Sequence, residues 1–247
     1  MFLAVDIGNS HVKLGVFDSE NLIQKISLPT PRDREFSPDD LHEIVEPISR
    51  CLICSVVPEI SVSVAAAIEE LYAMKPTIVC NDFDFGLTIL HTPLETIGTD
   101  RLVNCFSAVE RYGSPCIVCS VGTALTIDFV DSTRTLRGGV IAPGMQMLAK
   151  SMHTSTSQLP EVEIAATESV LQQTTVGAVQ SGVVNGFFGL FETLIEKMRE
   201  ETKSTPQVIA TGGAAGFVAK NVRGIDVVDE NLLLDGLERL DARINQA

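Results

Sequence analysis

Positive charge is scarce in this sequence. Its 247 residues include 18 lysines and arginines against 32 aspartates and glutamates, which gives a formal net charge of −14 at pH 7. A surface this acidic repels a nucleic acid backbone, so we expect no DNA or RNA partner. A bound nucleotide would have to be held by backbone amides, a few selected cations and a metal ion.

Long apolar runs are missing as well. Although 45% of the residues are hydrophobic, no segment reaches the roughly 18 unbroken apolar residues of a membrane span. The apolar stretch that opens the chain meets a carboxylate at Asp6, which is too early for a secretory signal. We therefore expect a cytoplasmic protein without a membrane partner.

Patterns that would bind a metal are few. The histidines lie far apart, and the six cysteines include two pairs with CxxC spacing, Cys51 with Cys54 and Cys116 with Cys119. Zinc sites place this spacing in a tight turn, so that both thiolates face one ion. Here both pairs lie in apolar, β-branched runs typical of buried strands, on which residues three apart face opposite sides. We favour buried reduced thiols for all six cysteines and keep zinc as the weaker alternative.

The chain repeats one order of elements twice. Each half opens with three short strands and then alternates helices with apolar strands, which predicts an α/β protein. The first half has predicted strands at 2–7, 11–17, 22–28, 51–57 and 77–80, and helices at 39–49, 60–73 and 99–112. The second has strands at 116–121, 124–130, 135–141, 207–210 and 224–228, and helices after 144, within 169–200, after 213 and at 230–243. No linker rich in proline or serine separates the halves, so we expect them to share a cleft.

A polar turn follows the first predicted strand. It contains Asp6, Gly8, Asn9 and Ser10, and Lys13 lies on the next strand. Backbone N–H groups of such a turn can bind phosphate, and a carboxylate at the strand end can hold Mg²⁺ through water. An ordinary β-turn would use the same residues, and Lys13 also fits a solvated strand position.

Two further glycine turns follow predicted strands of the second half. Gly122 and Thr123 repeat the combination of glycine and a small hydroxyl residue, so two such turns on opposite halves would hold one polyphosphate between them. Gly212 and Gly213 would let a flat ring or a ribose approach the backbone closely. Taken alone, the two glycines are better explained by a strand-to-helix turn that needs a positive φ.

In this order the three turns resemble the phosphate-1, phosphate-2 and adenosine motifs of the actin, Hsp70 and hexokinase superfamily. Residues 98–101 (GTDR) are similar to the Gly-Ala-Asp-Arg motif of type III pantothenate kinases, the Bvg accessory factor family. Residues 138–144 (GGVIAPG), and Thr174 and Thr175 ahead of residues 181–182, agree with the same family. The resemblance covers essentially the whole chain. It implies an α/β, duplicated actin-like (ribonuclease H-like) ATPase fold, with half-domains 1–114 and 115–247 around a cleft.

The resemblance also implies a function, the ATP-dependent phosphorylation of pantothenate to 4'-phosphopantothenate, which is the first step of coenzyme A biosynthesis. The general base on the substrate hydroxyl would be Asp100, although Thr99 and Asp100 also fit a plain helix N-cap. The implied substrate-binding residues are Gly98, Thr99, Arg101 and Thr175. The implied ATP-binding residues are Asp6, Gly8, Asn9, Ser10, Lys13, Gly122, Thr123, Gly212 and Gly213. Mg²⁺ and a monovalent cation, K⁺ or NH₄⁺, would accompany ATP, with Asp6 and Ser120 as metal ligands.

The helix expected at 180–198 points to an assembly. It is spaced by glycines and rich in phenylalanine, and it has more apolar surface than one core face requires. The family that the chain resembles is dimeric. We therefore expect a two-fold homodimer through this helix or its neighbours.

Two positions depart from the family pattern. Ser120 stands where the family usually has an aspartate that helps to bind the monovalent cation, and a neutral hydroxyl is a weaker ligand. Leu90 and His91 stand near a position where the family often has a substrate-contacting tyrosine. A second hypothesis follows, a catalytically weakened member that binds a metabolite or a partner and regulates. A third, an actin-like phosphotransferase that acts on a sugar or acetate, is opposed by residues 98–101.

Overall fold

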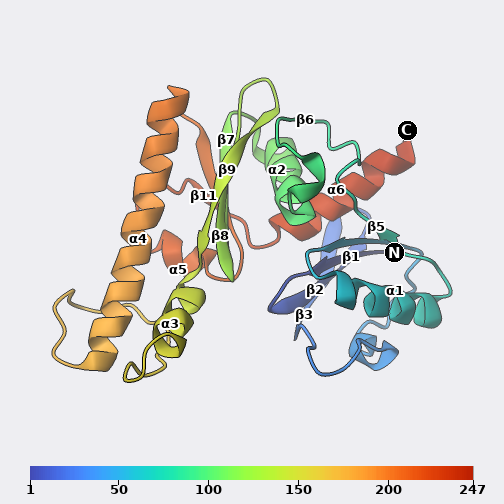
Figure 1. Ribbon diagram of the computed structural model, residues 1–247. Coiled ribbons are helices and arrows are strands. Elements are labelled where there is room, and N and C mark those ends of the chain that lie inside the picture. Colours follow the sequence, from blue (N-terminus) through green and yellow to red (C-terminus); the bar gives the residue numbers. More distant parts are fainter. Residues whose placement is uncertain (247) are drawn as a thin grey trace. The chain divides into compact units, whose positions relative to one another are not determined.

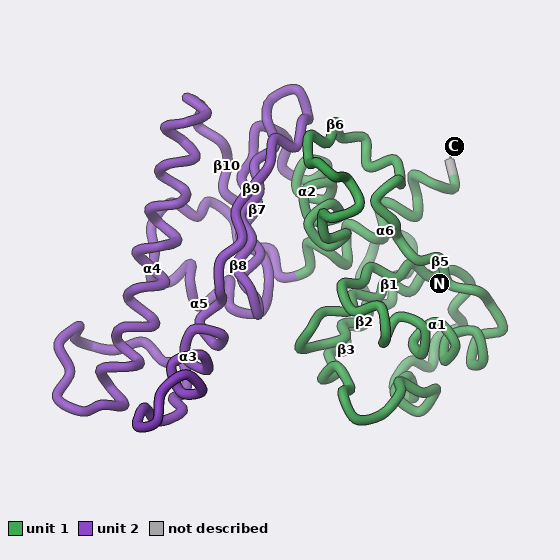
Figure 2. Tube along the Cα trace, in the orientation of Figure 1, with its two compact units in different colours: residues 1–111, 231–247 green, residues 112–230 purple. Residues whose placement is uncertain are grey.

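The computed structural model of the protein describes residues 1–246 (Figure 1). The described chain is mixed α/β with two sheets, which confirms the predicted fold class. It forms two compact units (Figure 2). Unit 1 contains residues 1–111 and the C-terminal segment from residue 231, and unit 2 is Tyr112–Glu230. The C-terminal helix thus belongs with the N-terminal strands, whereas the sequence pattern predicts a single boundary near residue 114. The functional roles of the two halves stay a prediction.

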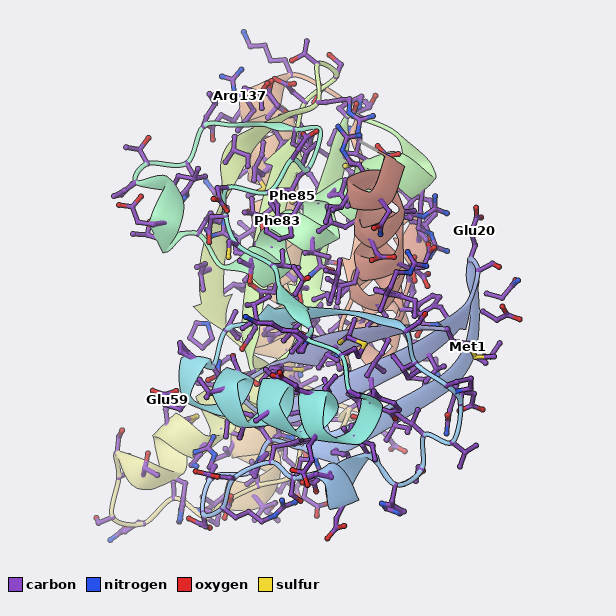
Figure 3. All side chains as sticks on the ribbon, turned by 90° about the vertical axis from the view of Figure 1, so that its right-hand side faces the viewer. Met1, Glu20, Glu59, Phe83, Phe85 and Arg137 are labelled. Carbon is purple, nitrogen blue, oxygen red and sulfur yellow. The ribbon has the colours of Figure 1, made fainter. Side chains whose placement is uncertain are left out.

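Unit 1 is built on a sheet with the strand order β3-β2-β1-β4-β5. The first three strands form an antiparallel meander, and β4 and β5 add in parallel to β1. Figure 3 shows Glu20 at the tip of the β2–β3 hairpin and Glu59 at the start of α1. The elements are β1 (Phe2–Ile7), β2 (His11–Asp18), β3 (Asn21–Pro29), η1 (Pro38–Leu41), β4 (Arg50–Ser55), α1 (Pro58–Tyr72), β5 (Thr77–Ile78), β6 (Thr88–Ile89), η2 (Leu94–Thr96), α2 (Thr99–Tyr112) and α6 (Leu232–Gln246).

The central strand β1 of unit 1 is buried on both faces. Leu3, Val5 and Ile7 alternate along it and pack into a cluster that includes Val64 and Ile68 of α1. The helix α6 contacts β1 and β4, and its residues Leu234, Leu237 and Leu240 are buried. The turn that follows β1 therefore begins at the end of a strand buried in the core of unit 1.

Unit 2 repeats the topology. Its own strands follow the order β11-β10-β7-β8-β9, with an antiparallel meander and two strands added in parallel. The helix α4 runs along one face of this sheet (Figure 1), and its Val183, Phe187 and Phe191 pack against strand residues such as Ile117 and Val208. The elements are β7 (Cys116–Val121), β8 (Ala124–Val130), β9 (Thr135–Pro143), α3 (Met145–Thr154), α4 (Thr175–Thr202), β10 (Gln207–Thr211), α5 (Ala215–Ala219) and β11 (Val227–Val228).

One predicted helix is wrong. In place of a helix at 39–49 the chain has only the short η1, followed by irregular backbone. The apolar spacing that favoured a helix is real, because Leu41, Ile44 and Ile48 are all buried. Pro47, however, cannot donate within a helix and restricts the residue before it to extended backbone. These side chains therefore reach the core from a loop.

The cysteines follow the prediction with one exception. Cys51, Cys54, Cys116 and Cys119 are buried and unbridged on strands, and no group of three or more potential ligands among residues 1–246 could hold a metal ion. Cys80, expected to be buried, is exposed because β5 ends at Ile78 and leaves this residue in a loop.

By length and composition alone, α4 could cross a membrane. The core helix of a soluble protein passes the same test, and α4 buries its phenylalanines against the unit 2 sheet. Packing within unit 2 therefore accounts for the buried apolar face of α4.

Candidate functional site

The turn after β1 carries the first group of predicted site residues. The N–H of Gly8 donates to the carbonyl oxygen of His11 at 3.0 Å and closes the turn. Asn9 and Ser10 are exposed at its tip. The β1–β2 register pairs Asp6 with Lys13, and Nζ of Lys13 lies 3.6 Å from Oδ2 of Asp6. The structure therefore brings the predicted phosphate-turn residues of unit 1 together.

Asp6 lies in an environment that disfavours negative charge. Its side chain is 13% exposed. The pKa of this carboxyl is raised to about 6: burial is the main cause, Lys13 opposes it, and the nearby Asp100 adds to it. A divalent cation would relieve this cost, and Mg²⁺ prefers oxygen ligands, so the site fits a magnesium ion that takes its remaining ligands from nucleotide and water.

The carboxylate of Asp100, at the start of α2, occupies space left open by the glycine two positions before it. A Cβ at Gly98 would collide with Oδ1 of Asp100, so the carboxylate lies directly against this glycine. The N–H of Arg101 donates to the carbonyl oxygen of Gly98 at 3.1 Å and begins the helix. Arg101 is 7% exposed and engaged within the protein. Glycine at position 98 is thus a steric requirement of the Asp100 geometry.

The hydroxyl of Thr99 is used inside the protein. It donates to the carbonyl oxygen of Ser55 at 3.2 Å and accepts from the thiol of Cys54 at 3.5 Å. If Thr99 binds substrate, it therefore does so through its backbone groups. Cys54 is paired with Asp6 in the β1–β4 register, and burial, followed by Asp6 and Asp100, raises its pKa well above the ordinary value. A neutral thiol thus lies close to the two carboxylates.

A loop precedes this helix start. Nδ2 of Asn81 donates to the carbonyl oxygens of Leu94 at 3.0 Å and of Ile97 at 2.6 Å, and so ties the segment before Gly98 to the loop that follows β5. Leu90 is exposed, and Nε2 of His91 lies 3.0 Å from Oγ1 of Thr96. The segment in which the family often has a tyrosine is therefore an exposed loop in this chain.

The predicted second phosphate turn lies at the end of β7 in unit 2. The N–H of Gly122 donates to the carbonyl oxygen of Ala124 at 3.0 Å. The N–H of Gly144 donates to the carbonyl oxygen of Thr123, also at 3.0 Å, and a Cβ at Gly144 would collide with the carbonyl oxygens of Gly122 and Thr123. The last glycine of the 138–144 motif is therefore needed to let β9 end beside this turn.

The predicted adenosine turn, which contains Gly212 and Gly213, packs against the same strand end. Gly212 has φ +94°, a conformation that favours glycine, and a Cβ there would lie 2.6 Å from the carbonyl oxygen of Val121. That oxygen accepts from the N–H of Ala214 at 3.1 Å. A Cβ at Gly213 would meet no described atom within 4 Å, which leaves room for a ring or a ribose. Unit 2 thus joins its two predicted nucleotide turns into one structure.

Ser120 and Thr175 also lie in unit 2. The registers pair Ser120 with Thr126 on β8 and with Thr211 on β10, so three hydroxyl side chains share one face of the sheet. Thr175 is the exposed first residue of α4, and Oγ1 of its neighbour Thr174 caps the helix by accepting from the N–H of Gly177 at 3.1 Å. Thr175 is therefore open to a ligand at a helix N-terminus, where anions are favoured.

Residues 2–197 match the profile of the family described as type III pantothenate kinase. The chain belongs to this family. A curated type III pantothenate kinase from Bacillus cytotoxicus is 33% identical over 254 aligned residues, which cover 98% of this chain and 96% of that protein. The family match includes the first two nucleotide turns, residues 98–101 and Thr175.

Solved structures agree in fold. A conserved Baf family protein from Campylobacter jejuni has a TM-score of 0.62 at 19% identity and covers 99% of this chain and 100% of its own. The activator of 2-hydroxyisocaproyl-CoA dehydratase from Clostridium difficile, solved with bound ADPNP, has a TM-score of 0.54 at 10% identity and covers 100% and 97%. At these identities the likeness concerns the fold alone.

Three residues of this pantothenate kinase family member support the site without a sequence signal of their own. Cys54 lies beside both carboxylates, Asn81 ties down the segment before Gly98, and Thr30 contacts the first phosphate turn. Their partners are mostly backbone carbonyls distant in sequence, and such contacts leave no pattern in one chain.

Proposed function

We propose that this chain transfers the γ-phosphoryl group of ATP to the primary hydroxyl of pantothenate. The observation that carries the proposal is the family match over residues 2–197. The geometry of unit 1 supports it, because a carboxylate at the start of α2 lies close to the phosphate-turn carboxylate Asp6. Catalysis of this transfer needs a base, a positioned alcohol and neutralised phosphate charge.

Asp100 is proposed as the base that accepts the proton of the pantothenate hydroxyl. The alcohol oxygen then forms a bond to the γ-phosphorus as the bond between that phosphorus and the bridging oxygen breaks, and ADP leaves. Arg101, Thr175 and the backbone at Gly98 and Thr99 are proposed to bind pantothenate. The proposed ATP-binding residues are Asp6, Gly8, Asn9, Ser10, Lys13, Gly122, Thr123, Gly212 and Gly213. Mg²⁺, held beside Asp6 when bound, would neutralise phosphate charge.

A coupled assay of ADP release tests the proposal. We expect release that depends on pantothenate and saturates with it, in buffers containing K⁺ or NH₄⁺. ADP release at the same rate without pantothenate, or only with a sugar or acetate as acceptor, would overturn it.

Ser120 motivates a second candidate, a weakened member that binds its ligands and regulates. The hydroxyls of Ser120, Thr126 and Thr211 offer neutral oxygens on one face, whereas a carboxylate binds a monovalent cation more strongly. We predict that Ser120→Asp raises kcat/KM for ATP about tenfold in K⁺ or creates a dependence on K⁺. Steady-state kinetics with and without K⁺ measure this.

The control for this prediction is Ser132→Asp, which adds the same charge at an exposed turn of unit 2. Strong K⁺ stimulation of the natural protein would mean that other oxygens already bind the cation. An unchanged ATP affinity and cation response in Ser120→Asp would mean that position 120 is not a ligand.

We also propose a two-fold homodimer through α4. Gly182, Gly186 and Gly189 are exposed on one side of this helix, and a Cβ at each would meet no described atom within 4 Å. Val176 at its first turn is exposed, and Leu171 just before it is 89% exposed. Glycines let two helices approach closely, and the apolar residues would be covered by a second copy.

Light scattering at micromolar concentration tests the dimer. We expect the mass of two chains for the natural protein and of one chain for Gly186→Glu, which places a charge on the glycine stripe. A monomer mass for the natural protein contradicts the proposal.

We assign the enzyme to the cytoplasm, where thiols stay reduced, and cell fractionation without detergent checks this.

A further inference from the structure

Thr30 contacts the first phosphate turn from the side. It follows β3 directly and is 9% exposed. Its Oγ1 donates to the carbonyl oxygen of Gly8 at 2.6 Å, and its N–H donates to the carbonyl oxygen of Ser10 at 3.0 Å. One residue thus binds two carbonyls of the turn, although it lies 22 positions after Gly8.

Both hydrogen bonds of Thr30 hold carbonyl groups that would otherwise be able to face and repel a phosphate. A turn binds phosphate through N–H groups, whereas a carbonyl oxygen facing the ligand repels the phosphate oxygens. Because the carbonyls of Gly8 and Ser10 are engaged by Thr30, they are turned toward the protein. The bond from the N–H of Gly8 to His11 closes the turn on its other side.

Thr30 is itself held rigidly. It lies between Pro29 and Pro31. Proline fixes its own φ, and the residue before a proline is restricted to extended backbone. The backbone of Thr30 therefore has little freedom, which fixes the direction of its N–H donor.

We propose that Thr30 is a positioning residue that holds the phosphate turn in the conformation that binds the phosphates of ATP. The role rests on the proposed function, because it concerns the same nucleotide site. It goes beyond that function by assigning the turn conformation to a residue that does not itself touch the ligand. A change at Thr30 should therefore act on ATP and leave pantothenate binding unchanged.

Titration calorimetry with Mg²⁺-ATP and steady-state kinetics test this in four variants. Thr30→Val keeps the shape but removes the hydroxyl donor, and we expect ATP affinity to fall about tenfold, since the partly buried carbonyl of Gly8 loses its partner. Thr30→Ser keeps the donor and should bind ATP within about threefold of the natural protein. Thr30→Ala serves if the valine variant does not fold. Thr77→Val makes the same change at an exposed position of β5 and should alter nothing.

The outcomes distinguish a failure of the Thr30 role from a failure of the proposed function. A folded Thr30→Val or Thr30→Ala variant with natural ATP affinity overturns the role, even if its melting temperature is lower, because a purely structural contact would lower Tm alone. A rise in the KM for pantothenate equal to that for ATP also overturns it. If the natural protein itself binds no ATP, the proposed function fails, and the role of Thr30 fails with it.

Discussion

Replacement of Asp100 by asparagine is expected to lower kcat at least about 100-fold, the usual scale of general-base catalysis. Asparagine has nearly the same shape, so the start of α2 and its contact with Gly98 should survive. The amide cannot accept the hydroxyl proton of pantothenate. Single-turnover and steady-state rates at saturating ATP and pantothenate measure the loss, and circular dichroism checks the fold.

Asp18→Asn is the matched control, because Asp18 is an exposed aspartate at the end of β2. It should leave kcat unchanged. If Asp100→Asn keeps a near-natural rate at saturating substrates, Asp100 only begins a helix, and the mechanism proposed above is wrong.

Replacement of Asp6 by asparagine is expected to stabilise the fold at neutral pH. The pKa of Asp6 is about 6 in the folded protein against an ordinary value of 3.8, chiefly because of burial. The folded protein therefore binds the proton of Asp6 more tightly than the unfolded chain does. This preference stabilises the fold fully below pH 3.8, and the stabilisation is lost as the pH rises through about 6. Above that pH the ionised carboxylate costs up to about 3 kcal/mol, which the asparagine avoids.

Denaturant unfolding from pH 4 to pH 8 measures this effect. The difference in unfolding free energy between Asp6→Asn and the natural protein should grow between about pH 4 and 6 and then level off. Loss of the ion pair with the partly exposed Lys13 reduces the gain only slightly. The same variant should bind Mg²⁺-ATP weakly, since the amide carries no charge for the metal. If the difference in unfolding free energy between the two proteins does not vary with pH, ionisation of Asp6 does not destabilise the fold.

Local patterns predicted most of the elements. The strand at 116–121 and the helix at 99–112 have the predicted bounds, because each is an apolar run ended by glycine or begun by an acidic first turn. The helix predicted at 39–49 is wrong because the apolar spacing of this segment suits a helix, whereas Pro47 cannot donate a helical hydrogen bond. The placement of α6 with unit 1 depends on contacts with β1 and β4 that no local pattern encodes.

In the candidate site, too, local patterns predict some features and long-range contacts determine the others. The turns themselves could be predicted because glycine and small polar residues after an apolar strand favour turns, whereas their role in binding nucleotide came from the family motif at residues 98–101 and stays a prediction. The collision that fixes glycine at position 98 and the internal bonds of Thr99 appear only in three dimensions. Thr30 and Asn81 act on backbone carbonyls distant in sequence, so their side chains could not be assigned beforehand.

Mass spectrometry of the product tests the central claim most directly. The natural protein is incubated with ATP, Mg²⁺, K⁺ and pantothenate, with Asp100→Asn in parallel. The account predicts pantothenate carrying one added phosphoryl group, formed in step with ADP, and at least about 100-fold less of it with the variant. Binding of ATP without any phosphorylated pantothenate, in K⁺ or in NH₄⁺, would contradict the account and favour a regulatory binding protein.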